Sequence, residues 1–182
     1  MAYIEINNDF PGIRGLMAFR SETAEPLNDL AEALLRGENS LSMGERELIA
    51  TFVSAQNDCF FCQNSHGGYA QYFMGCDTDF IDRIKKDYLE ADIPEKLKAL
   101  LVIAESVTHG GKFVTADQVQ KAKDLGASDR EIHDTVLIAA AFCMFNRYVD
   151  GLGTTAPEDR QYYITRAANR AHLGYKNYDP AG

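Results

Sequence analysis

Hydrophobic residues recur at helical spacing along most of the chain. In the segment from residue 42 to 56, Leu48, Ile49, Phe52 and Val53 fall on one face of a helix, because residues three or four apart lie above one another. No segment combines strand alternation with hairpin turn residues. The pattern predicts an all-α fold, a helical bundle of seven to eight helices.

Residues typical of helix ends place the boundaries of these helices. In a capping box, a Ser or Thr N-cap and a Glu or Gln three residues later satisfy each other's backbone N–H groups. A proline favours a helix start, whereas a glycine favours a helix end. Capping boxes begin at Ser42, Thr115 and Ser128, and we expect further helix starts at Pro26, Thr78, Pro94 and Thr155, the last helix extending to about Leu173.

The helix predicted from residue 128 to 150 is unusually hydrophobic. Its segment 136–145, VLIAAAFCMF, is apolar on nearly every side, so a solvent-facing surface would expose apolar area. We therefore expect this helix to be buried inside the subunit or between subunits, and the chain to form a closed homo-oligomer. The segments after Ser42 and Ser128 also resemble each other, which suggests an internal duplication.

Length and charge narrow the class of protein. The 182 residues fit a single domain, 1–182, with a short N-terminal arm at 1–8, a core motif at 42–74 and a polar C-terminal tail at 174–182. The formal net charge of -9 argues against nucleic acid or an anionic membrane as a partner, because both require clustered Lys and Arg. No signal segment or membrane span is recognisable. We expect a cytoplasmic protein.

The chemistry is concentrated between residues 47 and 66. Cys59 and Cys62 are three residues apart, and His66 follows four residues later, so one helix would carry all three on the same face. Asn57 and Asp58 are favourable N-cap residues, which would start the helix just before Cys59. Unpaired N–H groups and the helix dipole at such a start favour the thiolate form of a cysteine, and this should make both thiols reactive.

Two acid-base groups accompany the thiols. His66 is placed to take a proton from Cys62, as in many cysteine enzymes. Glu47 lies about 100° from Leu48 around the helix, at the edge of the buried face, where a carboxylate needs a partner. The arrangement of thiols, imidazole and carboxylate predicts thiol redox chemistry.

Metal binding and a thioredoxin fold are the structural alternatives for the Cys-x-x-Cys motif. Tetrahedral zinc requires four ligands, and no second Cys-x-x-Cys or His-x3-His supplies the others. A thioredoxin fold would place the motif after a strand, which the helical pattern does not provide. We therefore expect no metal and no cofactor.

The motif resembles that of a known family. The spacing E-x11-C-x2-C-x3-H from Glu47 to His66, within the phrase SAQNDCFFCQNSH, is similar to the core of alkylhydroperoxidase D (AhpD)-like proteins in the carboxymuconolactone decarboxylase superfamily. The phrase FNRYVDGLG at 145–153 resembles a hallmark of its peroxidase-related enzyme subgroup. The resemblance extends over about residues 26–173.

This resemblance implies a thiol peroxidase with an AhpD-like helical bundle. Mapped onto this chain, Cys62 would be the peroxidatic cysteine, which becomes a sulfenic acid, and Cys59 the resolving cysteine, which closes the disulfide. Glu47 and His66 would relay protons to Cys62, partly through water. Phe61 departs from the best-known members, which carry a histidine between the two cysteines.

The resemblance also implies partners. The substrate would be a hydroperoxide and the reductant a dithiol, either a lipoyl protein, a thioredoxin-like protein or a small thiol. Related proteins form trimers or hexamers, so a homotrimer or homohexamer is expected. Two other functions fit the superfamily: a carboxymuconolactone decarboxylase-like enzyme acting without a cysteine pair, and a non-catalytic redox-responsive protein. The intact Cys59 and Cys62 pair argues against the decarboxylase.

Overall fold

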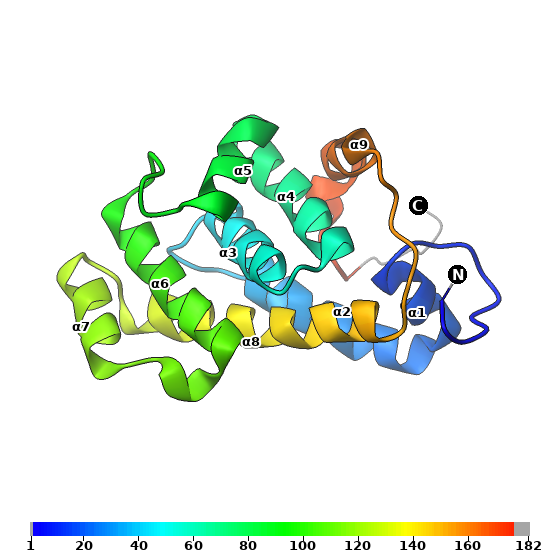
Figure 1. Ribbon diagram of the computed structural model, residues 1–182, viewed down its shortest axis with the longest axis horizontal. Helices are drawn as coiled ribbons and strands as arrows, with labels where there is room; N and C mark the ends of the chain where they lie inside the picture. Colours follow the sequence, from blue (N-terminus) through cyan, green and yellow to red (C-terminus); the bar gives the residue numbers. More distant parts are fainter. Residues whose placement is uncertain (1, 177–182) are drawn as a thin grey trace.

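The computed structural model describes residues 2–176, which form an all-helical structure (Figure 1). The predicted fold class is confirmed, although these residues contain nine α-helices rather than seven or eight. Two short 3-10 helices, η1 (Gly111–Phe113) and η2 (Ala171–Leu173), complete the secondary structure of this part of the chain. The α-helices are α1 (Ile13–Phe19), α2 (Ser21–Leu35), α3 (Met43–Gln56), α4 (Phe60–Met74), α5 (Thr78–Lys86), α6 (Glu95–His109), α7 (Ala116–Asp124), α8 (Asp129–Gly151) and α9 (Arg160–Arg170).

Three helix starts follow the predicted capping boxes. Ser42, Thr115 and Ser128 each accept the backbone N–H three residues later, and the side chain at that third position reaches back. Each box satisfies backbone groups that a helix start otherwise leaves unpaired. These interactions explain why α3, α7 and α8 begin where the sequence predicts.

Three other starts were predicted wrongly. α2 begins at Ser21, so Pro26 lies inside the helix instead of opening it. The N-cap of α5 is Asp77 rather than Thr78, and that of α9 is Asp159 rather than Thr155. In both cases a carboxylate accepts a backbone N–H of the first turn, an interaction that the helix dipole strengthens.

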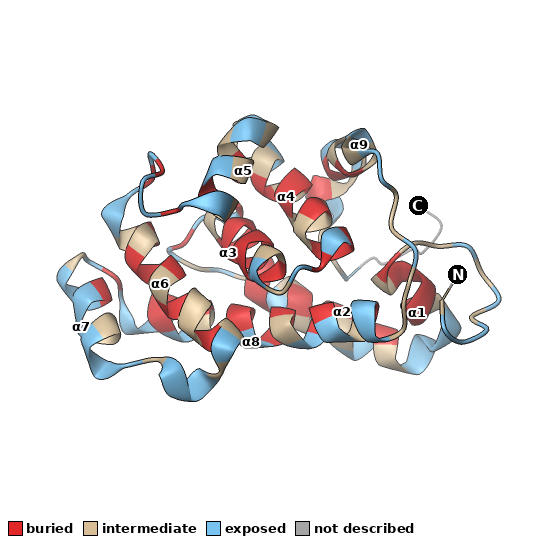
Figure 2. Ribbon diagram, viewed as in Figure 1, coloured by how far each residue is buried: buried red, intermediate tan, exposed pale blue. Residues whose placement is uncertain are grey.

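Helix α3 forms the centre of the bundle. It packs against α4, α5, α6 and α8, and Figure 2 shows buried residues along α3 and on the facing sides of α4, α6 and α8. The four hydrophobic residues predicted for its inner face, Leu48, Ile49, Phe52 and Val53, are fully buried. Because Glu47 lies on this helix, its carboxylate is placed inside the core of the bundle.

The close contact between α4 and α9 depends on a glycine. A Cβ atom added to Gly68 would lie 2.8 Å from the backbone oxygen of Tyr163, closer than packed atoms approach. Glycine lets the two helix backbones approach closely despite its cost inside a helix. This contact brings α9 beside the cysteine helix.

Helix α8 is only partly buried. Ile138, Phe142 and Phe145 face the core, as the hydrophobic pattern predicts. Leu137 and Met144 are 38% and 44% exposed, and Ala140 between them is also exposed. Within the described chain, α8 thus retains an outward-facing apolar row of Leu137, Ala140 and Met144.

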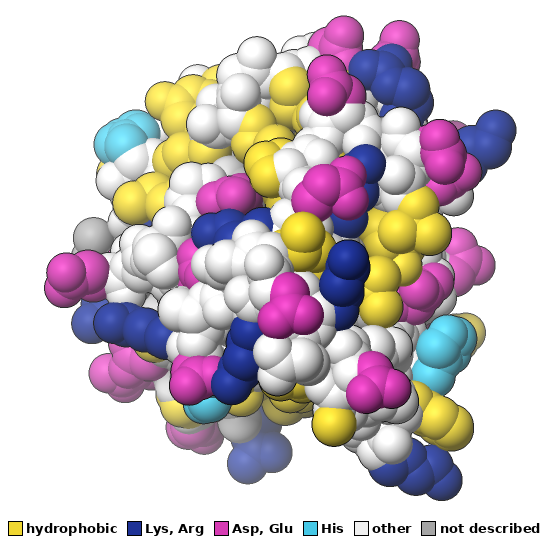
Figure 3. All heavy atoms as spheres, turned by 90° about the vertical axis from the view of Figure 1, so that its left-hand side faces the viewer, with side chains coloured by type: hydrophobic (Ala, Val, Ile, Leu, Met, Phe, Trp, Pro, Cys, Tyr) yellow, Lys and Arg dark blue, Asp and Glu magenta, His cyan; other side chains and the backbone are white. Residues whose placement is uncertain are grey.

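The end of the molecule near α6 and α7 has a mixed surface. Acidic, basic and hydrophobic side chains lie next to one another on this face (Figure 3). Among residues 2–176, no helix is both long and apolar enough to cross a membrane.

The chain ends differ in structure from one another. Residues 2–8, predicted to be a short arm, contain no helix or strand, and Tyr3 N donates to Leu152 O at 2.8 Å. Of the predicted polar tail at 174–182, residues 177–182 lie outside the described part. Tyr175, by contrast, is half-buried against the core.

Candidate active site

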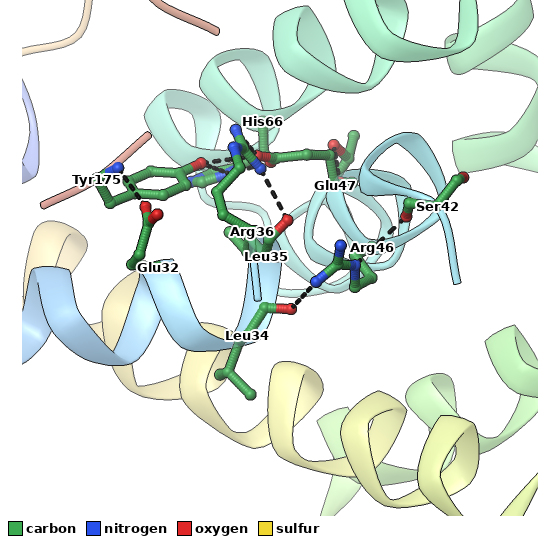
Figure 4. Close-up of polar contacts among 10 residues, drawn as sticks. Glu32, Leu34, Leu35, Arg36, Ser42, Arg46, Glu47, His66 and Tyr175 are labelled. Atoms are coloured by element: carbon green, nitrogen blue, oxygen red, sulfur yellow. Dashed lines mark hydrogen bonds and ion pairs between the residues drawn. The ribbon is translucent and has the colours of Figure 1, made fainter. Parts of the chain in front are cut away.

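The candidate site is built around the carboxylate of Glu47. This side chain is completely buried in α3. Its Oε2 lies 2.7 Å from Nδ1 of His66 on α4, and its Oε1 lies 2.6 Å from Nη2 of Arg36. Tyr175 Oη donates to Oε1 at 2.7 Å. Figure 4 shows the side chains of Arg36, His66 and Tyr175 gathered beside Glu47.

Arg36 follows directly after α2 and is held there by a second arginine. Arg46 of α3 donates from Nη1 to Leu34 O at 3.0 Å (Figure 4) and to Gly37 O at 2.8 Å. These bonds satisfy carbonyls at the end of α2 that no intrahelical N–H can reach. Arg46 therefore fixes the turn from which Arg36 extends to Glu47.

Aromatic rings surround the Arg36 guanidinium. Its Cζ lies 4.8 Å from the ring centroids of Phe73 and Tyr175 and 5.6 Å from that of Tyr69. Arginine over aromatic faces gains cation–π attraction, which offsets part of the cost of burying the charge. The three rings and Glu47 together hold the Arg36 guanidinium in place.

The charges of this group support one another. Burial would raise the pKa of Glu47, but His66 and Arg36 outweigh it and lower that pKa below its usual value. Burial would lower the pKa of Arg36, yet Glu47 raises it. Burial, together with Glu47, raises the pKa of Tyr175 well above its ordinary value. The stable state is therefore a carboxylate held between a guanidinium and a neutral phenol.

An ionised Glu47 determines the orientation of the imidazole. A carboxylate can only accept hydrogen bonds, so Nδ1 of His66 donates to it. In a neutral imidazole the other nitrogen, Nε2, then carries the lone pair. The ring also packs edge-on against Phe142, with centroids 4.5 Å apart. His66 is thus oriented as a proton acceptor.

The start of the cysteine helix differs by one position from the prediction. Cys59 itself is the N-cap of α4, whereas Asn57 ends α3 and Asp58 has a φ of 57° in the turn between them. Asn146 of α8 holds this turn, since its Oδ1 accepts from Asn57 Nδ2 at 2.9 Å. Cys62 consequently occupies the third position of the helix, in its first turn.

The two thiols differ in environment. Cys62 is 4% exposed and lines a cavity, whereas Cys59 is fully buried and is not part of the cavity wall. Interaction with Cys62 and burial raise the pKa of Cys59 far above its ordinary value, and a hydrogen bond to Asp150 adds to this effect. Its burial and the neighbouring Cys62 thus favour the protonated form of Cys59, and the expected reactivity of both thiols stays a prediction.

The cavity has a volume of about 110 Å³. Its wall includes Cys62, His66 and Tyr175, and most of the remaining wall is hydrophobic. A dry cavity of about 150 Å³ can hold benzene, so this space suits a small organic molecule. Among residues 2–176, no three His, Cys, Asp or Glu side chains form a group that could hold a metal ion.

Phe61 forms part of the same wall. Its ring packs edge-on against Tyr163 at 5.9 Å between centroids. A Cβ atom on Gly12 would lie 2.3 Å from this ring, and Gly12 has a positive φ of 59°. Phe61 thus fills an apolar space and has no group that can exchange a proton. His66 supplies the imidazole of the cavity wall.

The structure brings the four predicted residues together as two pairs. Glu47 accepts a hydrogen bond from His66, the Cys59 and Cys62 thiols interact, and Cys62 lines the same cavity as His66. Sequence reasoning missed Arg36 and Tyr175. Arg36 has the pattern of an ordinary basic residue at a helix end, and Tyr175 belongs to the segment predicted as a polar tail, so neither carried a recognisable signal.

Comparisons with known proteins agree with this architecture. A structure of an uncharacterized peroxidase-related protein from Silicibacter sp. TM1040 is 25% identical, with a TM-score of 0.76, covering 85% of this chain and 78% of that one. An AhpD-core, peroxidase-related protein from Ralstonia eutropha JMP134 has the same identity and TM-score and covers 85% and 79%. No curated protein matches significantly.

The family assignment comes from the sequence profile of the carboxymuconolactone decarboxylase family. It matches residues 21–82 and again residues 78–156. The two matches contain Ser42 and Ser128, respectively, in line with the suggested internal duplication. Together they extend over most of the protein, so the chain belongs to the carboxymuconolactone decarboxylase family and has an AhpD-like fold.

Proposed function

We propose that this protein is a thiol-dependent peroxidase that reduces hydroperoxides through a Cys59 and Cys62 dithiol cycle. One observation carries the proposal. Cys62 lines a cavity together with His66, and the buried Glu47 orients His66, while Cys59 is buried on the same helix turn. Peroxide reduction requires a thiolate, a proton donor and a second thiol within reach.

In the first step, the Cys62 thiolate attacks the outer oxygen of the hydroperoxide. A sulfur–oxygen bond forms and the oxygen–oxygen bond breaks, so Cys62 is oxidised to a sulfenic acid and the peroxide is reduced. The leaving alkoxide takes a proton and departs as an alcohol. His66 takes the thiol proton of Cys62 beforehand and returns it here, directly or through water.

Glu47 supports both proton transfers. When His66 is protonated, the imidazolium lies 2.7 Å from a buried carboxylate, and this ion pair stabilises the positive charge. Arg36 and Tyr175 keep that carboxylate ionised and in place. Glu47, Arg36 and Tyr175 are therefore positioning residues, whereas His66 exchanges the proton.

In the second step, Cys59 resolves the sulfenic acid. Its sulfur attacks the Cys62 sulfur, a disulfide forms, and the hydroxyl leaves as water with the Cys59 proton. Rapid disulfide formation protects Cys62 from further oxidation. A dithiol reductant, either a lipoyl protein, a thioredoxin-like protein or a small thiol, then restores both thiols by exchange and becomes a disulfide itself.

Steady turnover tests this function. Purified protein is mixed with hydroperoxide and a small dithiol, and peroxide loss is followed over many equivalents. Mass spectrometry after one equivalent of peroxide, with and without alkylation, should detect a Cys59–Cys62 disulfide. Disulfide formation without sustained peroxide loss under any dithiol would favour a non-catalytic redox-responsive protein. No oxidation of either thiol would favour the decarboxylase-like alternative.

We also propose that the protein works as a closed homotrimer or homohexamer. The exposed apolar row on α8, formed by Leu137, Ala140 and Met144, supports this assembly. Burying apolar area against another subunit is favourable at roughly 25 cal/mol per Å². An oligomer would complete the burial that the sequence predicts for this helix.

A further inference from the structure

Three arginines line the active-site cavity and have no role in the proton relay. Arg14 extends from α1, and Arg166 and Arg170 extend from one face of α9, four residues apart. The same three arginines also line an outer groove of about 610 Å³ beside the cavity. This arginine cluster (Arg14, Arg166 and Arg170) therefore lies where the cavity meets the groove.

The arginine cluster concentrates positive charge. Burial lowers the pKa of Arg166, and the charges of Arg14 and Arg170 lower it further. Such mutual repulsion occurs only between cations that are close together. The chain as a whole has a formal net charge of -9. The arginine cluster is therefore a local concentration of positive charge on a protein that is negative overall.

The cluster is also built into the fold. Arg14 is 8% exposed, its Nη1 lies 2.6 Å from Tyr162 Oη, and its Cζ lies 5.4 Å from the ring centroid of Phe10. Arginine in a partly buried, fixed position is suited to hydrogen bonding a carboxylate with two parallel N–H groups. A surface arginine in water would gain much less from the same contact.

The inner cavity has the opposite character. Ile13, Met17, Leu27, Phe142 and Phe145 contribute hydrophobic side chains to its wall, and Cys62 lies in the same wall. A ligand that fills this space places an apolar body near the thiol. A ligand that extends toward the groove places its other end at the arginines.

We infer that the site accepts organic hydroperoxides whose compact apolar body carries a carboxylate. The hydroperoxide group lies at Cys62, the apolar body fills the cavity, and the carboxylate binds the arginine cluster. This inference rests on the proposed peroxidase function and specifies its substrate class. Hydrogen peroxide and neutral hydroperoxides lack the group that the arginines recognise.

A matched pair of substrates tests the inference. Cumene hydroperoxide is neutral, and its 4-carboxy derivative differs only by the added carboxylate. We expect the kcat/KM of the wild type to be at least tenfold higher for the carboxylated compound, since hydrogen bonds to charged groups are stronger than neutral ones. This preference should shrink as salt is added, because ions screen the attraction.

Variants of α9 connect the preference to the cluster. In Arg166→Met and Arg170→Met, the ratio of the two kcat/KM values should fall about tenfold or more. The control is Arg83→Met, which removes an exposed arginine of α5 outside the cavity and groove and should leave the ratio at the wild-type value. An equal kcat/KM for the two hydroperoxides in the wild type, or an unchanged ratio in both α9 variants, overturns the inference.

A binding measurement separates this inference from the proposed function. Titration calorimetry compares 4-isopropylbenzoate with 4-isopropylbenzyl alcohol, neither of which can be reduced. Tighter binding of the benzoate, weakened in Arg166→Met, supports the arginine site even if no hydroperoxide is consumed, an outcome that would overturn only the peroxidase. Peroxide turnover combined with equal binding of both compounds would overturn only the arginine site.

Discussion

Arg36 Nη2 lies 2.6 Å from Glu47 Oε1, with both side chains shielded from water at 6% and 0% exposure. Burying two charges costs several kcal/mol per ion before their attraction is counted. Glu47 also accepts a hydrogen bond from His66, which lines the same cavity as Cys62. The contact therefore connects the stability of the bundle to the orientation of the imidazole.

We expect Glu47→Gln to lower the free energy of unfolding by about 3–5 kcal/mol, because it leaves the buried Arg36 without its counter-ion. The double variant Glu47→Gln with Arg36→Met should lose less than the sum of the single variants, since no uncompensated charge remains. Urea unfolding measures all three. The control is Glu95→Gln, which breaks an ion pair whose carboxylate is 69% exposed and should cost under about 1 kcal/mol.

Acid should destabilise the wild type more than Glu47→Gln. Because the folded pKa of Glu47 is lowered, its contribution to stability is complete above the unfolded carboxyl pKa of about 4.3 and is lost as the pH falls through the folded value. Unfolding free energies measured from pH 7 downward should therefore converge for the two proteins. A constant difference down to pH 2 would contradict an ionised Glu47 in the folded state.

The two cysteines should separate the two chemical steps. Cys62→Ser is expected to abolish peroxide reduction, whereas Cys59→Ser should permit one oxidation without sustained turnover, because no resolving thiol remains. Stopped-flow oxidation with one equivalent of peroxide measures the first step. Cys76→Ser, which changes a half-buried cysteine outside the cavity, serves as the control. Equal single-turnover rates in Cys62→Ser and wild type would reject the assignment.

His66→Ala should slow thiol oxidation by a factor on the order of 10², the usual contribution of general acid–base catalysis. The pH profile of the remaining rate should differ from that of the wild type, because solvent instead of His66 then exchanges the proton. Tyr175→Phe provides a graded comparison: it removes one of the donors to Glu47 and should reduce the rate less than His66→Ala. A His66→Ala rate within a few-fold of wild type would remove the imidazole from the mechanism.

Much of the fold follows from local sequence signals. The Ser42 capping box and the apolar row from Leu48 to Val53 place α3 correctly, because a cap and a helical pattern act within a few residues. The pairing of Glu47 with His66 is implied by the family resemblance, whereas the residues alone indicate only that Glu47 needs a partner. The structure supplies that partner because α3 and α4 are neighbours joined by a short turn.

The rest depends on contacts between distant segments. Tyr175 reaches Glu47 across 128 positions of the chain, and no local pattern marks its phenol as a donor to a buried carboxylate. Asp58 takes a left-handed conformation, which is uncommon for any residue except glycine, and this moves Cys59 to the N-cap. The different environments of the two thiols follow from that shift and from the position of the cavity.

The final prediction concerns the outward-facing row of Leu137, Ala140 and Met144 on α8. If it is a subunit contact, sedimentation at micromolar concentration should give three or six times the monomer mass of 20.2 kDa. Leu137→Glu should shift the protein toward the monomer, because a carboxylate in an apolar interface is desolvated without a partner.

The control for this interface is Leu89→Glu, at a residue that is 55% exposed and lies outside the helices. It introduces the same charge at another exposed leucine, so its mass should equal that of the wild type. A wild type at 20.2 kDa would overturn the assembly. An oligomer that tolerates Leu137→Glu would place the contact elsewhere. If the monomeric variant keeps full peroxidase activity, the cavity formed within one subunit is sufficient for catalysis, and assembly then acts on stability alone.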